Sequence, residues 1–443
     1  MTARGRDKRD GERGQILAMM VISLLALCAL VAVAADVGFF FDYRRRIHSA
    51  ADAAAMAGAW QVRRERLQGL DPDSTNVRNE GYKASASNGF TKDVDGAQVT
   101  VNWPPLSGLY AAGGPGATPS AGSPDFVEAI ITQPRPTIFM AILGFQSATV
   151  SARAVAGAQD SDGCIYAMNH SARKAINLNG GAIVNASCGV VDNSNDPDAL
   201  DDSGGACMTA TSIAVTGGVG GNTSCVTVPG STPQTGVPPQ PDPLVGRAAP
   251  SFSSSCDHGT GTAPLCGQGS IGSGTWDLQP GVYCDGICIN SGAQVTFEPG
   301  TYILNGGGLK INGGTVNGTG VTFYNTATPG HTYQSVDISG GPTGVLTAPT
   351  SGAMEGMLFF QDRTISPSGS ARNNTVNGGG TLRLEGALYF PTTQLAFAGN
   401  SNPAATYTIL VADTIVFTGT STLNNNFSSL SNRNPFKRVA LAE

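Results

Sequence analysis

The most constraining feature of this sequence is an apolar run near its N-terminus. Positions 16–35 hold twenty consecutive residues, of which Ser23 is the one clearly polar member. At a helical rise of 1.5 Å per residue the run spans about 30 Å, the thickness of the hydrocarbon core of a bilayer. The run therefore predicts a transmembrane helix over 16–35, preceded by a basic segment, 1–15, and followed by a helical extension, 36–69.

The charges that flank the run predict its orientation. Five basic residues precede it, whereas the nearest cluster beyond it, Arg44–Arg46, has three. The positive-inside bias therefore places the N-terminus in the cytoplasm and the following chain outside it. A cleavable signal peptide is the alternative, because Ala32-Val33-Ala34 offers a small-x-small site with a cut before Ala35. Against it, the run exceeds the ~7–15 residues of an ordinary signal h-region.

Composition excludes two broad classes of protein. Charged residues make up 13% of the chain, about half of the ~25% that is usual, so a highly charged disordered chain is excluded. The basic residues form no stripe of the kind that binds nucleic acid, and no nucleic-acid partner is predicted.

Cysteine usage fits an exported chain. Of nine cysteines, Cys28 lies inside the apolar run. An even number in the exported part predicts up to four disulfides, with the pairing left open. The candidates are Cys164, Cys188, Cys207, Cys225, Cys256, Cys266, Cys284 and Cys288.

Two alternatives to disulfides are weighed for these cysteines. The first is a set of reduced, buried thiols. The second is a zinc site built from Cys256, His258, Cys266, Cys284 and Cys288. The spacing of this set matches no compact zinc-ligand pair, and oxidising compartments favour bridges. No metal or other cofactor is therefore predicted.

Three N-terminal segments resemble a known family. They are Arg13-Gly14-Gln15-Ile16-Leu17, Ala35-Asp36-Val37-Gly38 and the stretch 44–59, RRRIHSAADAAAMAGA. Over about residues 13–60, charged, small and apolar positions fall in the order found in TadG-like Flp (Tad) pilus-assembly proteins. The resemblance implies a single-pass protein of the bacterial inner membrane whose bulk is periplasmic or extracellular. It also implies other Tad pilus-assembly or envelope proteins as partners, beside membrane lipid.

The chain departs from that family's pattern in two ways. Many TadG-like proteins carry a von Willebrand A domain, but no Asp-x-Ser-x-Ser metal motif occurs here. Met19 stands at the fifth position after Gly14, where a pilin would carry Glu. The missing Glu counts against processing by a prepilin peptidase and against incorporation as a true pilin.

Beyond the apolar run, the sequence predicts a small pilin-like region. Ala50, Ala54 and Gly58 recur at helical spacing and form a small-residue stripe, against which a sheet of the same domain or another molecule could pack. Residues 70–159 predict an α+β region in which the long helix lies on a sheet. Its expected elements are strands at 98–103, 126–132 and 148–158 and a short helix at 136–143.

Residues 160–443 predict a Gly-rich repeat domain. A unit of an apolar residue, a polar residue and a small pair recurs at 178–181, 215–218, 289–292, 304–307, 311–314, 338–341, 376–379, 397–400 and 417–420. Short strands of this kind bury their apolar faces by stacking, so a parallel β-helix is expected, with an antiparallel β-sandwich as the alternative. The proline-rich stretch 229–250 predicts a linker or a strap across the surface, and the C-terminal residues 436–441 are expected to cap the last coil.

The sequence offers little catalytic chemistry. The acidic residues of 270–430 are scattered, and the pairs Asp362–Arg363 and Glu385–Arg383 are interpreted as solvated surface charges. The four histidines lack a nucleophile motif around them. Tyr324, Tyr333, Phe359, Phe360, Tyr389 and Phe390 form either an exposed stacking platform or part of the core.

The leading hypothesis is a non-enzymatic, membrane-anchored component of Flp pilus assembly. A surface adhesin with a glycan partner is the second hypothesis. A polysaccharide lyase or hydrolase is the third, because many parallel β-helices are such enzymes.

Overall fold

The computed structural model describes residues 10–68, 70–116, 122–160, 163–259, 270–377, 381–398, 405–430 and 437–443. These residues form two compact units, each treated by itself. Unit 1 comprises Met1–Glu65, Asp71–Gln159 and Arg438–Glu443, and unit 2 comprises Arg66–Leu70 and Asp160–Lys437. Residues 438–443 thus cluster with unit 1, whereas the sequence assigned them to the Gly-rich domain and to a cap on its last coil.

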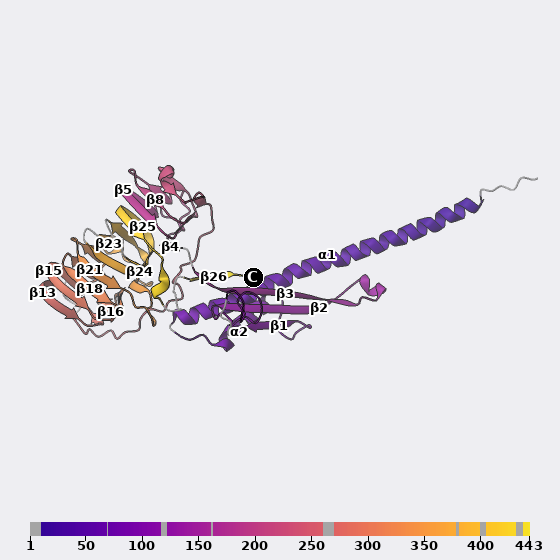
Figure 1. Cartoon of the computed structure of the whole chain (residues 1–443), viewed down its shortest axis with the longest axis horizontal. Coiled ribbons are helices and arrows are strands. Elements are labelled where there is room, and N and C mark those ends of the chain that lie inside the picture. The colour runs from indigo at the N-terminus through magenta and orange to yellow at the C-terminus, as the bar shows by residue number, and fades with distance from the viewer. Residues whose placement is uncertain are drawn as a thin grey trace, which may run out of the picture. The chain divides into compact units, whose positions relative to one another are not determined.

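The apolar run lies in one long helix, α1, which spans Asp10–Leu67 and has 58 residues. At 1.5 Å per residue α1 is about 87 Å long. Among the described residues it is the one helix long and apolar enough to cross a membrane. Of its most apolar 18-residue stretch, 6% is buried. The predicted N-terminal apolar helix is confirmed, and its continuation past residue 35 is visible as the long indigo helix of Figure 1.

Besides α1, unit 1 contains a second helix and a four-stranded sheet. Its other elements are α2 (Ser74–Ser87), β1 (Gln98–Asn102), β2 (Phe126–Pro136), the 3-10 helix η1 (Met140–Leu143), β3 (Ser147–Asp160) and β26 (Lys437–Leu441). The sheet has the order β1-β2-β3-β26, and the β1–β2 and β2–β3 pairs are antiparallel. Helix α2 was not predicted, although Asp73 caps it by accepting a hydrogen bond from the Thr75 N–H at 2.7 Å.

The C-terminal half of α1 packs on this sheet through small side chains. Ala50, Ala54 and Ala55 are fully buried together with Val127 and Ile131 of β2. A Cβ added to Gly58 would lie 2.8 Å from Cγ1 of Val127, closer than real Cβ contacts. The Ala50–Ala54–Gly58 stripe therefore lies inside unit 1, where it lets helix and sheet approach closely.

Unit 2 is a closed sheet of parallel strands, in which every described strand pairing is parallel. Many of its strands are short, and glycine corners follow several of them, such as β16 (Gly300–Asn305), β17 (Leu309–Asn312) and β20 (Val336–Ser339). The strands fall into three columns, and the antiparallel pairing of a β-sandwich is not found among the described strands of this unit.

The first column contains, in spatial order, β14 (Gly281–Tyr283), β16 (Gly300–Asn305), β19 (Val321–Thr326), β22 (Met357–Gln361), β24 (Leu382–Ala398), β25 (Thr408–Leu423), β4 (Gly163–Ala167), β6 (Gly189–Asp192), β9 (Ser212–Val215) and β12 (Gln234–Thr235). The other two columns add β13 (Ile271–Leu278), β15 (Ile287–Phe297), β17 (Leu309–Asn312), β18 (Thr315–Thr319), β20 (Val336–Ser339), β21 (Thr343–Thr347), β23 (Asn373–Asn377), β5 (Ile176–Ala186), β7 (Leu200–Asp202), β8 (Cys207–Thr209), β10 (Val219–Gly221) and β11 (Val226–Thr227). Three short 3-10 helices, η2 (Thr223–Cys225), η3 (Gly369–Arg372) and η4 (Phe427–Ser429), lie in the connections.

The recurring glycine pairs form corners between columns. Gly313 and Gly314, between β17 and β18, both have φ of 82°, and Gly340 and Gly341, between β20 and β21, have φ of 69° and 67°. Because β17 pairs with β20 and β18 with β21, the two corners lie on one another. Left-handed backbone at successive positions suits glycine, so the repeat in the sequence reports the corners of the fold.

A ladder of aromatic rings fills the interior of the first column. The ring centroids of Tyr302 and Phe323 are 5.5 Å apart, and those of Phe323 and Phe359 are 5.2 Å apart. Phe390 continues the ladder at 6.2 Å from Phe359. These side chains are fully buried, which places the largest part of the core inside the closed sheet.

The spatial order of strands in unit 2 differs from their sequence order. Strand β25, near the end of the unit, pairs with β4 and β5, which begin it. In Figure 1, β5 in pink therefore lies beside β25 in yellow. The stack runs from β13 to β25, then through β4 and β5 to β12. The chain between β12 and β13 must consequently return along the whole stack.

Candidate functional site

The return segment is a strap over the first column. We use the name strap for residues 236–259, which include most of the proline-rich stretch. From β12 to β14 the column crosses nine strand pairings, or about 43 Å at ~4.8 Å each. An extended chain of this length covers that distance, because extended residues rise up to ~3.3–3.6 Å each.

The strap contacts successive rungs in order, where a rung is one layer of the stacked strands. The main chain of Gln240 exchanges hydrogen bonds of 2.8 Å with the Asn193 side chain, beyond β6. Farther along, the ring of Phe252 lies 6.2 Å from that of Tyr324 in β19. At the far end, the Asp257 carboxylate accepts a 2.8 Å hydrogen bond from the Val282 N–H in β14. The predicted strap at 229–250 thus corresponds to ordered chain that holds rungs distant in sequence.

Arg363 fixes the middle of the strap. It follows β22 and donates from its guanidinium to the carbonyls of Arg247, at 2.8 Å, and of Leu244. The same group donates at 2.6 Å to the Tyr389 hydroxyl, and that hydroxyl donates to Asp242 of the strap at 2.5 Å. In return, the guanidinium of Arg247 donates to the carbonyls of Ala353 and Glu355. Burial and the neighbouring Asp242 raise the pKa of Tyr389, so it stays protonated as a donor.

The strap covers a second row of aromatic rings. Tyr324, Phe360 and Tyr389 alternate with the interior ladder along their strands, and their centroids are 5.5 and 5.2 Å apart. Arg363 lies 5.0 Å above both Phe360 and Tyr389. The six aromatic residues that the sequence left between platform and core are all buried, so they form no exposed platform.

The charge pairs of this region are structural rather than solvated. Asp362 accepts hydrogen bonds from Thr326, at 2.7 Å, and from Thr364. Although burial opposes ionisation, these hydrogen bonds outweigh it and hold the pKa of Asp362 below its ordinary value. The interpretation of Asp362–Arg363 as surface charges is therefore wrong, and Arg363 was the strap contact that sequence reasoning missed.

Three cysteine pairs lie at bonding distance. They are Cys164–Cys188, Cys207–Cys225 and Cys256–Cys284, with Cα atoms 5.7, 4.7 and 5.6 Å apart. Cys288 is also disulfide-bonded, and Cys266 lies outside the described residues. Cys28 in α1 is a free, exposed thiol. The first two bridges join adjacent rungs, and the third ties the strap to β14.

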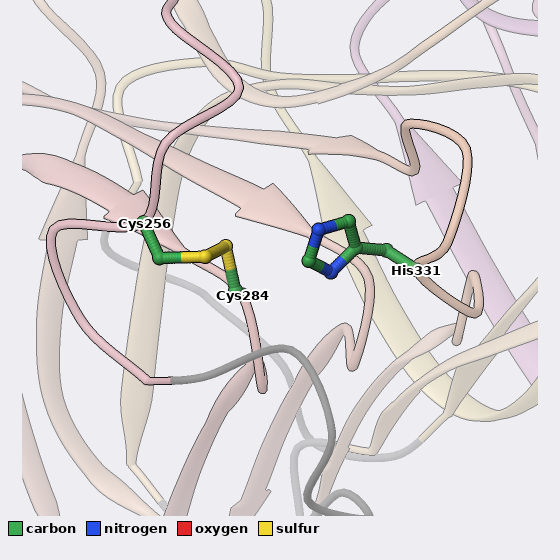
Figure 2. A group of neighbouring side chains, drawn as sticks. All are labelled: Cys256, Cys284 and His331. Atoms are coloured by element: carbon green, nitrogen blue, oxygen red, sulfur yellow. A yellow bond between two sulfur atoms is a disulfide. The ribbon is translucent and has the colours of Figure 1, made fainter.

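An imidazole lies beside the third bridge. Figure 2 shows the sulfur–sulfur bond between Cys256 and Cys284 with the ring of His331 next to it, and the three ligand atoms lie within 4.8 Å of one another. Zinc takes cysteine as thiolate, and the disulfide uses both sulfurs. His258, another member of the weighed zinc set, instead stacks on Tyr283 with centroids 4.3 Å apart.

The scattered carboxylates serve hydrogen bonding between rungs. Glu385 accepts from the N–H and hydroxyl of Thr406 at 3.0 and 2.9 Å. Asp413 accepts from the Asn169 side chain at 2.9 Å and pairs with Arg372. These contacts link neighbouring rungs, and they give each of the two groups a structural role.

Unit 1 has its own ion pair between the two inner strands of its sheet. Glu128 of β2 is fully buried and lies 2.6 Å from Nε of Arg153 in β3. Arg153 also pairs with Glu443, and the Val155 N–H donates to the Glu443 carbonyl at 2.8 Å. The C-terminal residues are thereby fixed to β3, which corrects the expectation that they cap the last coil of unit 2.

Two comparisons with protein families match the N-terminal third of the chain. Residues 14–61 match the family described as "Putative Flp pilus-assembly TadE/G-like". Residues 57–156 match the family described as "Putative Tad-like Flp pilus-assembly". The two matches together cover α1 beyond residue 13 and nearly all of the rest of unit 1 before β26. No curated protein and no solved structure matches the chain.

Proposed function

Because residues 14–156 are a Tad-like Flp pilus-assembly region, we propose that this chain is a membrane-anchored structural component of Flp pilus assembly. The observation that carries the proposal is the coincidence of both family matches with one structural unit, a long apolar helix laid on a small sheet. The exposed apolar half of α1 is the anchor in this proposal, with its N-terminus in the cytoplasm.

We also propose that unit 2 is a parallel β-helix that acts as a spacer or contact module outside the cytoplasm. Its three columns of parallel strands and its glycine corners support this description. In sequence, unit 2 is inserted between β3 and β26 of unit 1. Other Tad pilus-assembly proteins are its proposed partners.

The two rival functions have weaker support. A glycan-binding adhesin would need an exposed aromatic platform or a comparable surface, whereas the aromatic row of unit 2 lies under the strap. A polysaccharide-cleaving enzyme would need paired carboxylates, whereas Asp362, Glu385 and Asp413 are engaged with neighbouring rungs. We therefore propose a non-enzymatic role.

Deletion of unit 2 with retention of β26 tests the proposal. Joining residue 160 to residue 437 through a short Gly-Ser linker keeps the β1-β2-β3-β26 sheet of unit 1 available. In the source cells, loss of Flp pili in this variant supports an assembly role for unit 2. Normal pili with lost attachment to surfaces favour the adhesin. If deletion of the whole chain leaves both pili and attachment unchanged, the proposed function is wrong.

A further inference from the structure

The tip of the β2–β3 hairpin in unit 1 is strongly apolar and exposed. Ile138, Phe139, Ile142 and Phe145 are 58%, 41%, 84% and 61% exposed, respectively. No charged residue occurs from 137 to 147. Scattered exposed apolar residues are ordinary, but four within eight positions of one closed tip form a patch of the kind that marks an interaction site.

The tip is ordered rather than loose. The Thr137 N–H donates to the Gln146 carbonyl at 3.1 Å, and the Thr137 hydroxyl donates to the Phe145 carbonyl, so the two strands close below the tip. The 3-10 helix η1 ends at Leu143, and its C-cap residue Gly144 has φ of 93°. The apolar side chains are therefore held outward by a defined backbone.

Asp36 of α1 fixes the level of the tip. Its carboxylate accepts hydrogen bonds from the N–H groups of Ile138, Phe139 and Met140 at 3.1, 2.9 and 2.7 Å. Asp36 is also the first charged residue after the apolar run 16–35. The tip therefore lies where the apolar part of α1 ends.

Aromatic side chains of α1 close to this level are exposed as well. Phe39 and Phe41 are 62% and 63% exposed. Arg44–Arg46 begin about 12 Å beyond Asp36 along the helix, at 1.5 Å per residue. This level is suited to the phosphates of lipid headgroups. Apolar tip, aromatic side chains and arginines thus follow the polarity gradient of a membrane interface.

We propose that residues 137–146 insert into the bilayer interface beside the transmembrane helix, with phospholipid as the partner. This inference rests on the proposed membrane anchor and adds a second, peripheral contact to it. The hairpin and α1 would together give unit 1 two points of attachment. Two points restrict the tilt and rotation of the unit at the membrane surface.

A tryptophan reporter tests the insertion in the full-length chain. Trp60, Trp103 and Trp276 are replaced by Phe, and Ile142→Trp is introduced as the single emitter. The protein is reconstituted in phosphatidylethanolamine–phosphatidylglycerol vesicles that contain brominated acyl chains. Leu106→Trp is the matched control, because Leu106 is 76% exposed and lies beside Glu128, at the opposite end of β2 from the tip.

We expect brominated lipid to reduce the emission of Ile142→Trp at least twofold and to leave that of Leu106→Trp unchanged. Asp36→Ala in the reporter chain should reduce the quenching, because it removes the acceptor of three hydrogen bonds. If brominated lipid quenches the two reporters to the same extent in protein that floats with the vesicles, the inference is wrong while the anchor stands. A blue shift without quenching would indicate contact between proteins instead and also overturn it. Failure of the chain to float would refute the anchor itself.

Discussion

The guanidinium of Arg363 lies 5.0 Å above the ring of Tyr389 and donates a 2.6 Å hydrogen bond to its hydroxyl. The two residues come from neighbouring rungs, and both also contact the strap. Through this pair, a segment that crosses the stack from end to end is fixed at its midpoint. The strap is accordingly part of the folded unit and not a linker.

Arg363→Ala should release the middle of the strap. The variant loses hydrogen bonds to two strap carbonyls and leaves Asp242 without its arginine, so the free energy of unfolding should fall by about 2–3 kcal/mol. Trypsin should then cut after Arg247, which is 2% exposed in the folded chain. Arg363→Lys should behave similarly, because lysine lacks the planar fork of the guanidinium.

The control is Arg173→Ala. This variant loses an exposed ion pair with Asp198, and the loss should change the free energy of unfolding by less than ~0.5 kcal/mol. Unchanged trypsin resistance of Arg363→Ala would contradict this role.

Peptide mapping without reduction should recover Cys164–Cys188, Cys207–Cys225 and Cys256–Cys284. We predict Cys266–Cys288 as the fourth bridge, and one reactive thiol per unfolded, unreduced chain, that of Cys28. Replacement of Cys256 and Cys284 by Ser should lower the free energy of unfolding by about 3 kcal/mol, because the bridge closes a loop with a sequence separation of 28. Recovery of Cys256 or Cys284 in any other pair would refute the assignment of the strap end.

Asp192 should make a contribution to stability that falls as the pH rises. Burial raises the pKa of this carboxyl to about 7, although hydrogen bonds from the backbone of Ser194 and Ile176 oppose the shift. The folded state keeps a proton that the unfolded state releases above its ordinary value of 3.8. The contribution of Asp192 to stability is therefore greatest below pH ~4, falls by about 4 kcal/mol up to pH ~7 at ~1.4 kcal/mol per unit, and is level above.

Asp192→Asn is the matched test of this pH dependence. Urea unfolding at pH 4, 5.5, 7 and 8 should show a smaller fall for Asp192→Asn than for the wild type. Asp198→Asn, in the loop before β7, should keep the slope of the wild type. Equal slopes for Asp192→Asn and the wild type would rule out Asp192 as the origin.

Gly58→Leu should destabilise unit 1 by about 1–3 kcal/mol, because its Cβ alone would lie 2.8 Å from Val127 Cγ1. Val127→Ala should be destabilising by itself but should restore part of the loss in the double variant. Thermal unfolding of the four chains measures this coupling. If the effects of the two changes on stability are simply additive, the stripe does not pack on Val127. A contact with another molecule then becomes the better explanation of the stripe.

The sequence predicts the elements of this chain better than their order in space. Twenty apolar residues suffice to predict α1, and Gly313-Gly314 and Gly340-Gly341 report corners because only local backbone conformation is involved. The stacking of β25 on β4 and the pairing of β26 with β3 are long-range choices with no local signal. Arg363 looked like a surface charge for the same reason, since its acceptors in the strap lie more than a hundred residues away.

The place of unit 2 between β3 and β26 also sets an order of events during biogenesis. On the proposed topology, the edge strand that closes the small sheet emerges from the translocation channel after every rung of the stack. Until then β3 is an open edge of the sheet, and the ion pair between Arg153 and Glu443 cannot form. Once β26 has docked, unit 2 is joined to unit 1 by the chain at both of its ends, so a protease that cuts one of these connections does not release it from unit 1.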